Sequence, residues 1–373
     1  MEQELTSTDD TLQQPERSGQ PLPLQAVETG AISTPLQRSR HKHLLSTALV
    51  TRNTSHIKIR SDQLTHRIML GLLEGKNYTK HPARHLAEYR QALPKGQGSV
   101  SIALTPRSEE TWDHVLVSLD LLGDELVDTF VVLLAVALDT NEAEHITNPF
   151  AITADDILAV CQKKKSKGSY SPRQQQSVHE HIHTLARASV RVTLLGESKQ
   201  WQVESPLLEM LINAPLQGNE THTRHKDWQP WHLKIGNWIA MEPQMQYQTA
   251  MMARQVLQYH AKEQKHEKRL GRYLTIRYCI NAHSHKDRVK VSMGMLLAQA
   301  GITPDRNHPS RTREAIESAL TQLHTDGVIG RFAPLVDHSS HGREIQERIE
   351  QRAYHWWDDY QRQLWLFEPP ELL

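Results

Sequence analysis

The stretch SPRQQQSVHEHIHTLARASV, residues 171–190, has a counterpart 138 positions later in PSRTREAIESALTQLHTDGV, residues 309–328. Apolar residues three and four positions apart predict that each stretch begins as an amphipathic helix with one buried face. A β-branched residue then starts a strand. The matched positions are Arg173, Val178, Ile182, Leu185 and Val190 in the first copy and Arg311, Ile316, Leu320, Leu323 and Val328 in the second. We interpret this shared register as an internal duplication.

The similarity extends upstream, where residues 152–159 match residues 291–298 at an offset that differs by one position. A turn of different length would produce that difference. Both copies then have the order short helix, polar basic turn, amphipathic helix, strand, which is the order of a winged helix-turn-helix. Amphipathic spacing alone would match many helices, so the interpretation rests on element order and register. The sequence predicts an α+β, helix-rich fold with two winged helix-turn-helix domains in tandem.

The expected domain boundaries follow from this duplication and from composition. We expect a disordered acidic and polar tail at 1–37, a basic helical region at 38–98, a first winged-helix domain at 99–215, a second at 216–336, and a C-terminal helix with a tail at 337–373. Residues 124–138 should form a buried helix after a break at Gly123. Residues 190–195 and 200–204 should form the first wing, whereas the second wing has no evident return strand. Pro243 should open a helix that includes Met252.

Charge is distributed in blocks although the net charge is zero. Residues 38–107 carry a net +10, residues 161–199 a net +6 and residues 254–336 a net +7, whereas residues 108–160 contain twelve acidic residues and no basic one. Basic blocks on both repeats indicate a polyanion-binding protein. The alternative is a solvated surface on which the acidic block neutralises a basic one.

The candidate DNA-binding residues lie at the N-terminal ends of the two amphipathic helices. Arginine can bind guanine and glutamine can bind adenine in the major groove, while lysines contact phosphates. The first copy offers Lys163, Lys164, Lys165, Lys167, Tyr170, Ser171, Arg173, Gln174 and Gln175, and the second offers Arg306, Asn307, His308, Ser310, Arg311 and Arg313. For each residue taken singly, the alternative is an ordinary solvated helix start.

A competing motif lies inside the first helix, where His179, Glu180 and His183 satisfy H-E-x-x-H, the pattern of a zinc hydrolase. The chain has 23 histidines, so chance matches are expected, and the longer forms of the motif are absent. Glu204 would be a third ligand only if it left the expected wing. No phosphate-binding glycine loop or G-x-S-x-G motif occurs either. We predict no catalytic residue, metal site or cofactor, with the zinc hydrolase kept as a remote alternative.

The segment QLWLF near the C-terminus resembles the Q-L-x-L-F pentapeptide with which bacterial replication proteins bind the sliding clamp. The resemblance implies that the partner-binding residues are Gln363, Leu364, Leu366 and Phe367. Exposed apolar residues on a mobile acidic tail are unfavourable unless a partner covers them. The alternative is a tail that folds back on its own domain, helped by Trp356 and Trp357.

Tandem winged helices with such a pentapeptide resemble the replication initiators of iteron plasmids. The resemblance is architectural, covers about residues 100–335 and the tail, and includes no extended identity. It implies binding to directly repeated origin DNA, recruitment of a sliding clamp and a host helicase, and self-association into inactive dimers. We therefore expect sequence-specific double-stranded DNA binding in plasmid or mobile-element replication initiation. The alternative is a transcriptional regulator or an accessory DNA-binding protein of a mobile element.

The expected location is the cytoplasm, in association with the nucleoid or a plasmid. The two cysteines, Cys161 and Cys279, provide no disulfide framework. The polar start is not a signal peptide, and the longest apolar run, residues 127–138, is too short to cross a bilayer. We expect no membrane partner.

Overall fold

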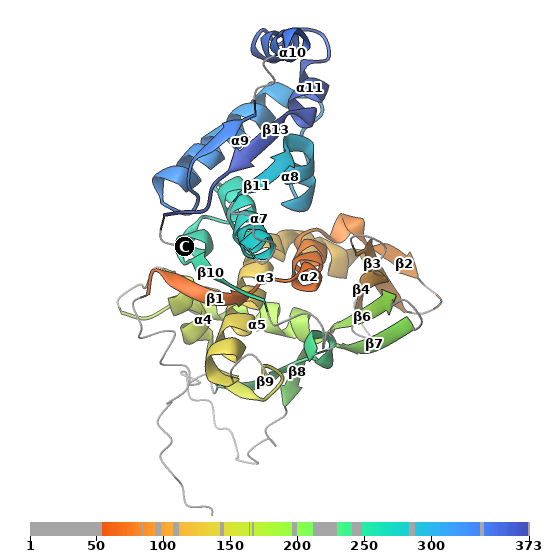
Figure 1. The fold of residues 1–373 in the computed structure, drawn as a ribbon. Helices are drawn as coiled ribbons and strands as arrows, with labels where there is room; N and C mark the ends of the chain where they lie inside the picture. The colour runs from red at the N-terminus through yellow and green to blue at the C-terminus, as the bar shows by residue number, and fades with distance from the viewer. Residues whose placement is uncertain are drawn as a thin grey trace, which may run out of the picture. The chain divides into compact units, whose positions relative to one another are not determined.

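The computed structural model describes residues 54–81, 83, 85–93, 98–106, 112–141, 145–163, 165, 168–195, 200–211, 230–240, 248–282, 288–335 and 339–371. These residues form a mixed α/β fold with several sheets (Figure 1). The tail expected at 1–37 lies outside the described residues. Among the described helices, none combines the length and apolarity needed to cross a membrane.

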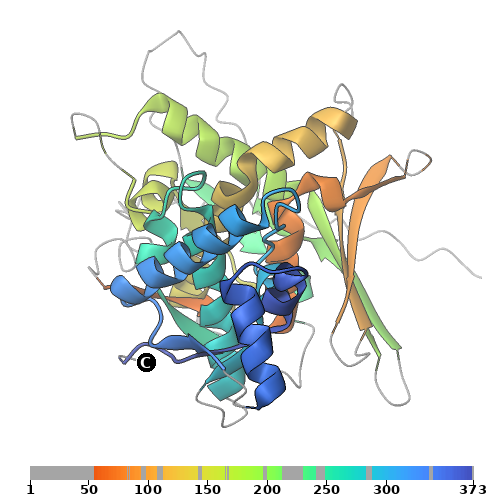
Figure 2. The ribbon, with the colours of Figure 1, turned by 90° about the horizontal axis from the view of Figure 1, so that it is seen from above.

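The first half is built around an antiparallel five-stranded sheet of order β2-β3-β4-β6-β7. Its strands are β2 (Thr79–His81), β3 (Leu86–Ala92), β4 (Gly98–Leu104), β6 (Ala188–Leu195) and β7 (Gln200–Pro206). Side chains alternate across the sheet, so Tyr89, Ile102 and Val190 share its buried face. The paired β6 and β7 confirm the hairpin expected there, and Figure 2 shows it beside β3 and β4.

Helices α2 (Gln63–Leu73) and α3 (Trp112–Asn141) supply the core of this half, and a short 3-10 turn, η1 (Gly75–Asn77), follows α2. As predicted, residues 124–138 are mostly buried and Gly123 interrupts the helix. Gly123 has a φ of 29° inside α3, a conformation that L-residues with side chains avoid.

Two of the expected domain boundaries fall inside sheets. β3 and β4 are paired strands, so the boundary at 98 divides one hairpin, and the region before it is not purely helical. β9 (Trp231–Ile235) pairs with β5 (Phe150–Ile152) and with β8 (Leu208–Leu211), and so belongs with the first half rather than the second. The turn η4 (Asn237–Ala240) follows it.

The prediction that Met252 lies in a helix is wrong. Met252 lies in β10 (Thr249–Ala253), which pairs with β1 (His56–Arg60), a strand nearly two hundred positions earlier. The short helix α6 (Gln255–Gln258) begins only afterwards. Long-range pairing therefore overrides the local helical pattern at this position.

Both repeats contain two consecutive helices after a strand. The first has α4 (Ala154–Val160) and α5 (Pro172–Ala186), and the second has β11 (Val289–Ser292), α8 (Met293–Gln299) and α9 (Pro309–Thr325). Matched positions are buried alike, as the shared register predicts, but the strand expected to start at Val328 begins only at Phe332. The buried pairs are Ile157 and Leu296, Leu158 and Leu297, Val178 and Ile316, Ile182 and Leu320, Leu185 and Leu323, and Val190 and Val328.

The second half closes with a three-stranded sheet of order β11-β13-β12, in which β12 is Phe332–Pro334 and β13 is Leu364–Phe367. The return strand missing from the sequence interpretation is therefore β13. Two helices, α10 (Ser340–Glu350) and α11 (Trp356–Arg362), are inserted between β12 and β13. The single helix expected here is interrupted where Arg352 and His355 adopt positive φ values.

Candidate nucleic-acid interface

The N-terminal end of α5 presents one arginine to solvent. Ser171 and Gln174 form a capping box, in which the Gln174 side chain accepts the Ser171 N–H at 2.9 Å. Gln175 donates to Asp155 of α4 at 2.8 Å. Both glutamines therefore have structural roles, whereas Arg173 is exposed and no described residue pairs with it. Among the residues discussed at this helix end, Arg173 is thus the one whose side chain no described contact holds.

Fewer side chains of the basic turn before α5 are free to contact a ligand than its composition suggested. Lys163 pairs with Glu125 of α3 at 3.2 Å. Tyr170, expected on the polar face, is buried, and the ammonium of Lys165 lies 5.0 Å from the centre of its ring. Lys165 is itself exposed. Lys164 and Lys167 lie outside the described residues. Of the two lysines that the structure describes in this turn, Lys165 is thus the more exposed one.

The turn before α9 is organised by Asp305, a residue that the sequence interpretation missed. Its carboxylate accepts the Asn307 N–H at 2.9 Å and lies 2.9 Å from the His308 Nδ1. The hydrogen bond from His308 and the Asn307 N–H lower the pKa of the Asp305 carboxyl. Asp305 in a polar turn before proline was the available signal. Asn307 and His308 are exposed but held in place by this turn.

The arginines around α9 have different roles. Arg306 and Arg311 are exposed, and neither forms an ion pair with a described residue. Arg313 instead pairs with Glu317 at 2.9 Å, donates to the Ile349 carbonyl and stacks over Tyr360. It anchors the inserted helices, so its assignment as a DNA-reading residue is corrected. Ser310 is partly buried in the first turn of α9.

The first histidine of the H-E-x-x-H motif is used in packing. The His179 ring lies 4.4 Å from the ring of Trp231, and burial lowers its pKa to about 4. Glu204, the third ligand that the zinc alternative would need, pairs with Arg191 on the adjacent strand at 2.7 Å. Within the described residues, no group of three histidine, cysteine or acidic side chains could hold a metal ion.

His181, between the two motif histidines, connects α5 to α3. Its Nδ1 is hydrogen-bonded to the Thr129 hydroxyl at 2.8 Å, and burial lowers the pKa of the ring to about 4. The neutral imidazole thus lies next to a cavity of about 150 Å³ between α3, α4 and α5. This contact fixes the buried face of the proposed reading helix.

The segment QLWLF does not form a free tail. Phe367 is 0% exposed and Trp365 is buried, because both belong to the inner face of β13. Gln363 donates to Gln346 of α10 at 2.8 Å. Leu364 is exposed and Leu366 partly so, on the outer face. The premise of an exposed clamp-binding peptide is therefore wrong, and the fold-back alternative is the one observed. The aromatic residue that would enter a partner's pocket already fills the core.

A buried network of charges joins the two halves. Helix α7 (Lys265–Ala282) lies against α3 (Figure 1), and three of its basic side chains meet two aspartates there. The contacts are Lys268 to Asp128 at 2.5 Å, Arg269 to Asp124 at 2.8 Å, and Arg272 to both aspartates at 3.0 Å. Burial raises the pKa of the Asp128 carboxyl, and the adjacent Lys268 and Arg272 oppose that rise. The sequence signal was a pair of aspartates four residues apart in an apolar helix.

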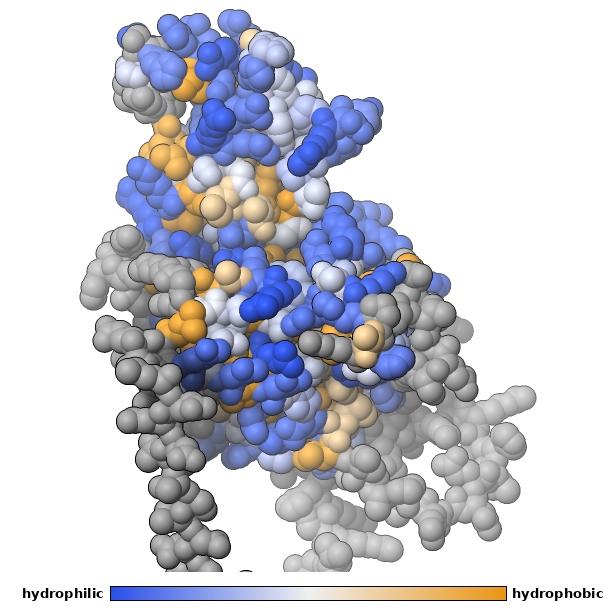
Figure 3. All heavy atoms as spheres, turned by 90° about the vertical axis from the view of Figure 1, so that its right-hand side faces the viewer, coloured by the Kyte–Doolittle hydropathy of each residue, from blue (hydrophilic) through white to orange (hydrophobic). Residues whose placement is uncertain are grey.

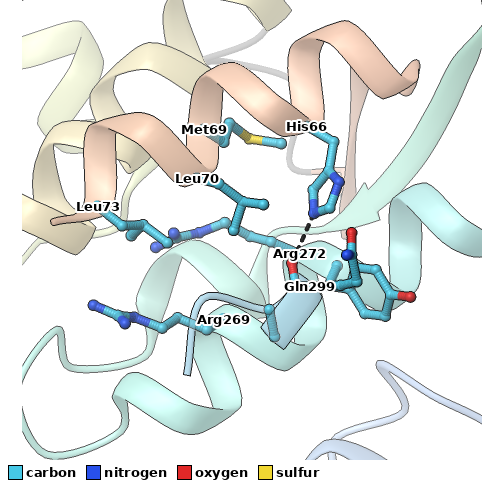
Figure 4. Close-up of a pocket in the computed structure, with 9 residues that line it drawn as sticks. His66, Met69, Leu70, Leu73, Arg269, Arg272 and Gln299 are labelled. Atoms are coloured by element: carbon cyan, nitrogen blue, oxygen red, sulfur yellow. Dashed lines mark hydrogen bonds between the residues drawn. The ribbon is translucent and has the colours of Figure 1, made fainter. Parts of the chain in front are cut away.

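Figure 4 shows the same junction from the side of α2. His66 points from α2 towards α8, and its Nε2 donates to the Gln299 carbonyl at 2.8 Å. Arg269 extends from α7 and also donates to the Gly301 carbonyl. Contacts from α2 and α7 therefore hold the end of α8 and the following Gly301 against the first half.

The exposed hydrophobic residues are dispersed. Trp201, Met295 and Tyr354 are among the most exposed large apolar side chains described, and they belong to separate parts of the chain, whereas Leu335 and Leu364 are neighbours joined by a backbone hydrogen bond. On the face drawn in Figure 3, hydrophilic residues predominate and hydrophobic ones form small separate groups. Polar and charged groups therefore dominate what this face offers to a ligand.

Comparisons with known proteins give a loose structural likeness. No protein-family model matches the chain, and no curated protein sequence matches it. Crystals of domains 2 and 3 of RctB provide two similar structures. One, a selenomethionine derivative, is 12% identical with a TM-score of 0.38 and covers 68% of this chain and 85% of its own. The other is 10% identical with a TM-score of 0.39 and covers 82% and 98%.

Proposed function

We propose that the chain binds double-stranded DNA through two winged helix-turn-helix units, with α5 and α9 as the reading helices. The observation that carries the proposal is the repeated arrangement of strand, short helix, turn and amphipathic helix, with buried residues in one register. In each copy, an exposed arginine that pairs with no described residue stands in the first turn of the second helix, Arg173 in α5 and Arg311 in α9. This is where a helix that enters the major groove contacts base edges.

The role we propose is initiation of replication at repeated origin sites of a plasmid or mobile element. Two reading units in one chain, joined by buried ion pairs, suit a single protomer that reads two adjacent DNA segments. A dimeric regulator with one unit per chain would instead match a palindrome through its twofold axis. Regulation of transcription remains the second candidate, because the same reading units serve both roles.

Selection of bound fragments from random double-stranded DNA tests both proposals. We expect enrichment of a site without internal twofold symmetry, bound by one protomer. Native mass spectrometry of the complex on the selected site would give that stoichiometry. An enriched palindrome bound by two protomers would favour the regulator, and the absence of any enriched sequence would contradict specific DNA binding.

A further inference from the structure

A cavity of about 150 Å³ lies between α3, α4 and α5, three helices that pack against one another (Figure 1). Protein interiors contain few voids larger than a water molecule, and empty space of this size destabilises a fold. The ion pair between Lys163 and Glu125 lines one end of the cavity, and both side chains are partly exposed. That end is therefore the one nearest to solvent, and opening of the ion pair would admit a small molecule there.

One wall of the cavity is apolar. Ile157 and Leu158 of α4 and Val178 of α5 are buried and line it. Cys161, which is also buried, contributes its side chain from the end of α4. A buried water molecule needs two to four polar partners, and aliphatic side chains supply none. An apolar group is therefore a better occupant of this side of the cavity than water.

The other wall presents a hydrogen-bond acceptor from His181. The Thr129 hydroxyl donates its single proton to the Glu125 carbonyl at 3.1 Å, so it accepts from the ring in its 2.8 Å contact with the His181 Nδ1. Burial lowers the pKa of His181 to about 4, so the ring is neutral near pH 7 and its Nε2 carries a lone pair. The Ser177 hydroxyl lies 3.4 Å from this Nε2, which is longer than a normal hydrogen bond. His181 therefore keeps capacity to accept a hydrogen bond from an occupant of the cavity.

The carboxylates that line the cavity already have cationic partners. Asp128 accepts from Lys268 and Arg272. Glu125 pairs with Lys163. A charged ligand would therefore enter a largely buried space without a counter-charge, which is unfavourable. The cavity is suited to an uncharged molecule.

We propose that this cavity binds a small uncharged molecule that has an apolar ring or chain and one hydrogen-bond donor. The donor reaches the His181 Nε2, and the apolar part packs against Leu158 and Val178. An engineered protein cavity of about this volume binds benzene, which sets the size of the ligand at about six carbon atoms. Because His181 and Val178 belong to α5, the bound molecule contacts the helix proposed to read DNA from its buried side.

Thermal unfolding of the full chain in phenol and in benzene tests this site, because the two probes share a ring and only phenol has a donor. At phenol concentrations several times Kd, we expect the Tm of the wild type to rise by roughly 2 °C, and benzene should raise it less. Cys161→Met should fill the cavity and abolish the response to phenol. Cys279→Met is the matched control, because it makes the same change at a half-buried cysteine of α7 that does not line the cavity. Relative to its own Tm without phenol, this control should respond as the wild type does.

Methyl NMR of the wild type supplies a second readout, which holds even if Cys161→Met does not fold. Phenol should shift the methyl resonances of Leu158 and Val178 and leave those of their counterparts in the second repeat, Leu297 and Ile316, unchanged. An unchanged wild-type Tm together with unchanged methyl resonances would refute the site, and so would a phenol response that persists in Cys161→Met. An equal response to benzene would refute the proposed hydrogen bond. None of these measurements involves DNA, so their outcome is independent of the proposed function.

Discussion

The ammonium group of Lys268 lies 2.5 Å from the carboxylate of Asp128, with both side chains buried between α7 and α3. Lys268 also donates to the Leu257 carbonyl at 2.9 Å. Because α3 belongs to the first half and α7 leads into the second, this pair determines how the two halves are joined. Its removal should therefore affect folding before it affects any surface property.

Replacing Lys268 by methionine should lower the free energy of unfolding by about 3–5 kcal/mol, because Asp128 would lose its closest counter-charge in the interior. Urea-induced unfolding followed by circular dichroism measures this loss. Lys262→Met, at an exposed position near the start of α7, should change stability by less than about 0.5 kcal/mol. The double variant Asp128→Leu, Lys268→Met should lose less than the sum of its single variants, since Arg272 keeps Asp124 as a partner. Full additivity would contradict the pairing.

Alanine at Arg173 and at Arg311 should each weaken binding to the selected DNA site by about 1–3 kcal/mol and relax the preference at one position. Both side chains are exposed, so Tm should stay within about 1 °C of the wild type. Fluorescence anisotropy with matched and mismatched duplexes measures the effect. Arg313→Ala is the contrasting variant, because it should loosen the inserted helices and lower Tm. Unchanged specificity in both Arg173→Ala and Arg311→Ala would remove α5 and α9 as reading helices.

Phe367→Ala should destabilise the second half by about 3–5 kcal/mol, because it empties a fully buried position in β13. Leu364→Ala, in the same strand but 41% exposed, should cost less than about 1 kcal/mol. A clamp-binding peptide would lose affinity for its partner in both variants without any loss of stability. Thermal unfolding of the two variants side by side separates these outcomes. Small and equal changes in Tm for the two variants would contradict the burial of Phe367 in β13.

Stability should fall as the pH decreases from about 6.5 to about 4, partly because of His66. Burial lowers its folded pKa to about 4 from an ordinary value of 6.5, so the unfolded chain binds a proton that the folded chain resists. The linkage predicts that His66 contributes roughly 2 kcal/mol of this loss by pH 4.5. In His66→Asn, the difference in unfolding free energy between pH 7 and pH 4.5 should shrink by about that amount. His341→Asn, an exposed control on α10, should keep the wild-type difference.

The repeat was predictable from the sequence because it is a local pattern. Val178, Ile182 and Leu185 mark one face of a helix through spacing alone, and so do their counterparts in α9. The break of helix α3 at Gly123 and the end of helix α9 before Gly327, where φ is 69°, follow from glycine's conformational freedom. Elements of this kind can be predicted without knowledge of the tertiary structure.

Long-range pairing was not predictable from the same patterns. Met252 fits an amphipathic helix, yet β10 pairs with β1, and nothing near Met252 in sequence encodes that partner. β13 likewise becomes a central strand only because two distant strands flank it. The candidate nucleic-acid interface was also only partly predictable from the sequence. In the sequence, Arg173 and Arg313 are both arginines near the start of an amphipathic helix. Only the fold reveals that Arg313 donates to the Ile349 carbonyl and lies over the ring of Tyr360.

The position of β13 between β11 and β12 affects the order in which the nascent chain can fold. Neither outer strand has its partner until Leu364–Phe367 has left the ribosome, so α9 first emerges before the three-stranded sheet of the second half can form. At about 5–20 residues per second, translation of the inserted helices imposes a delay of seconds. The first half, whose hairpins pair strands made earlier, can consolidate during that interval. The second half is therefore the part of the chain that stays incompletely folded for longer during synthesis.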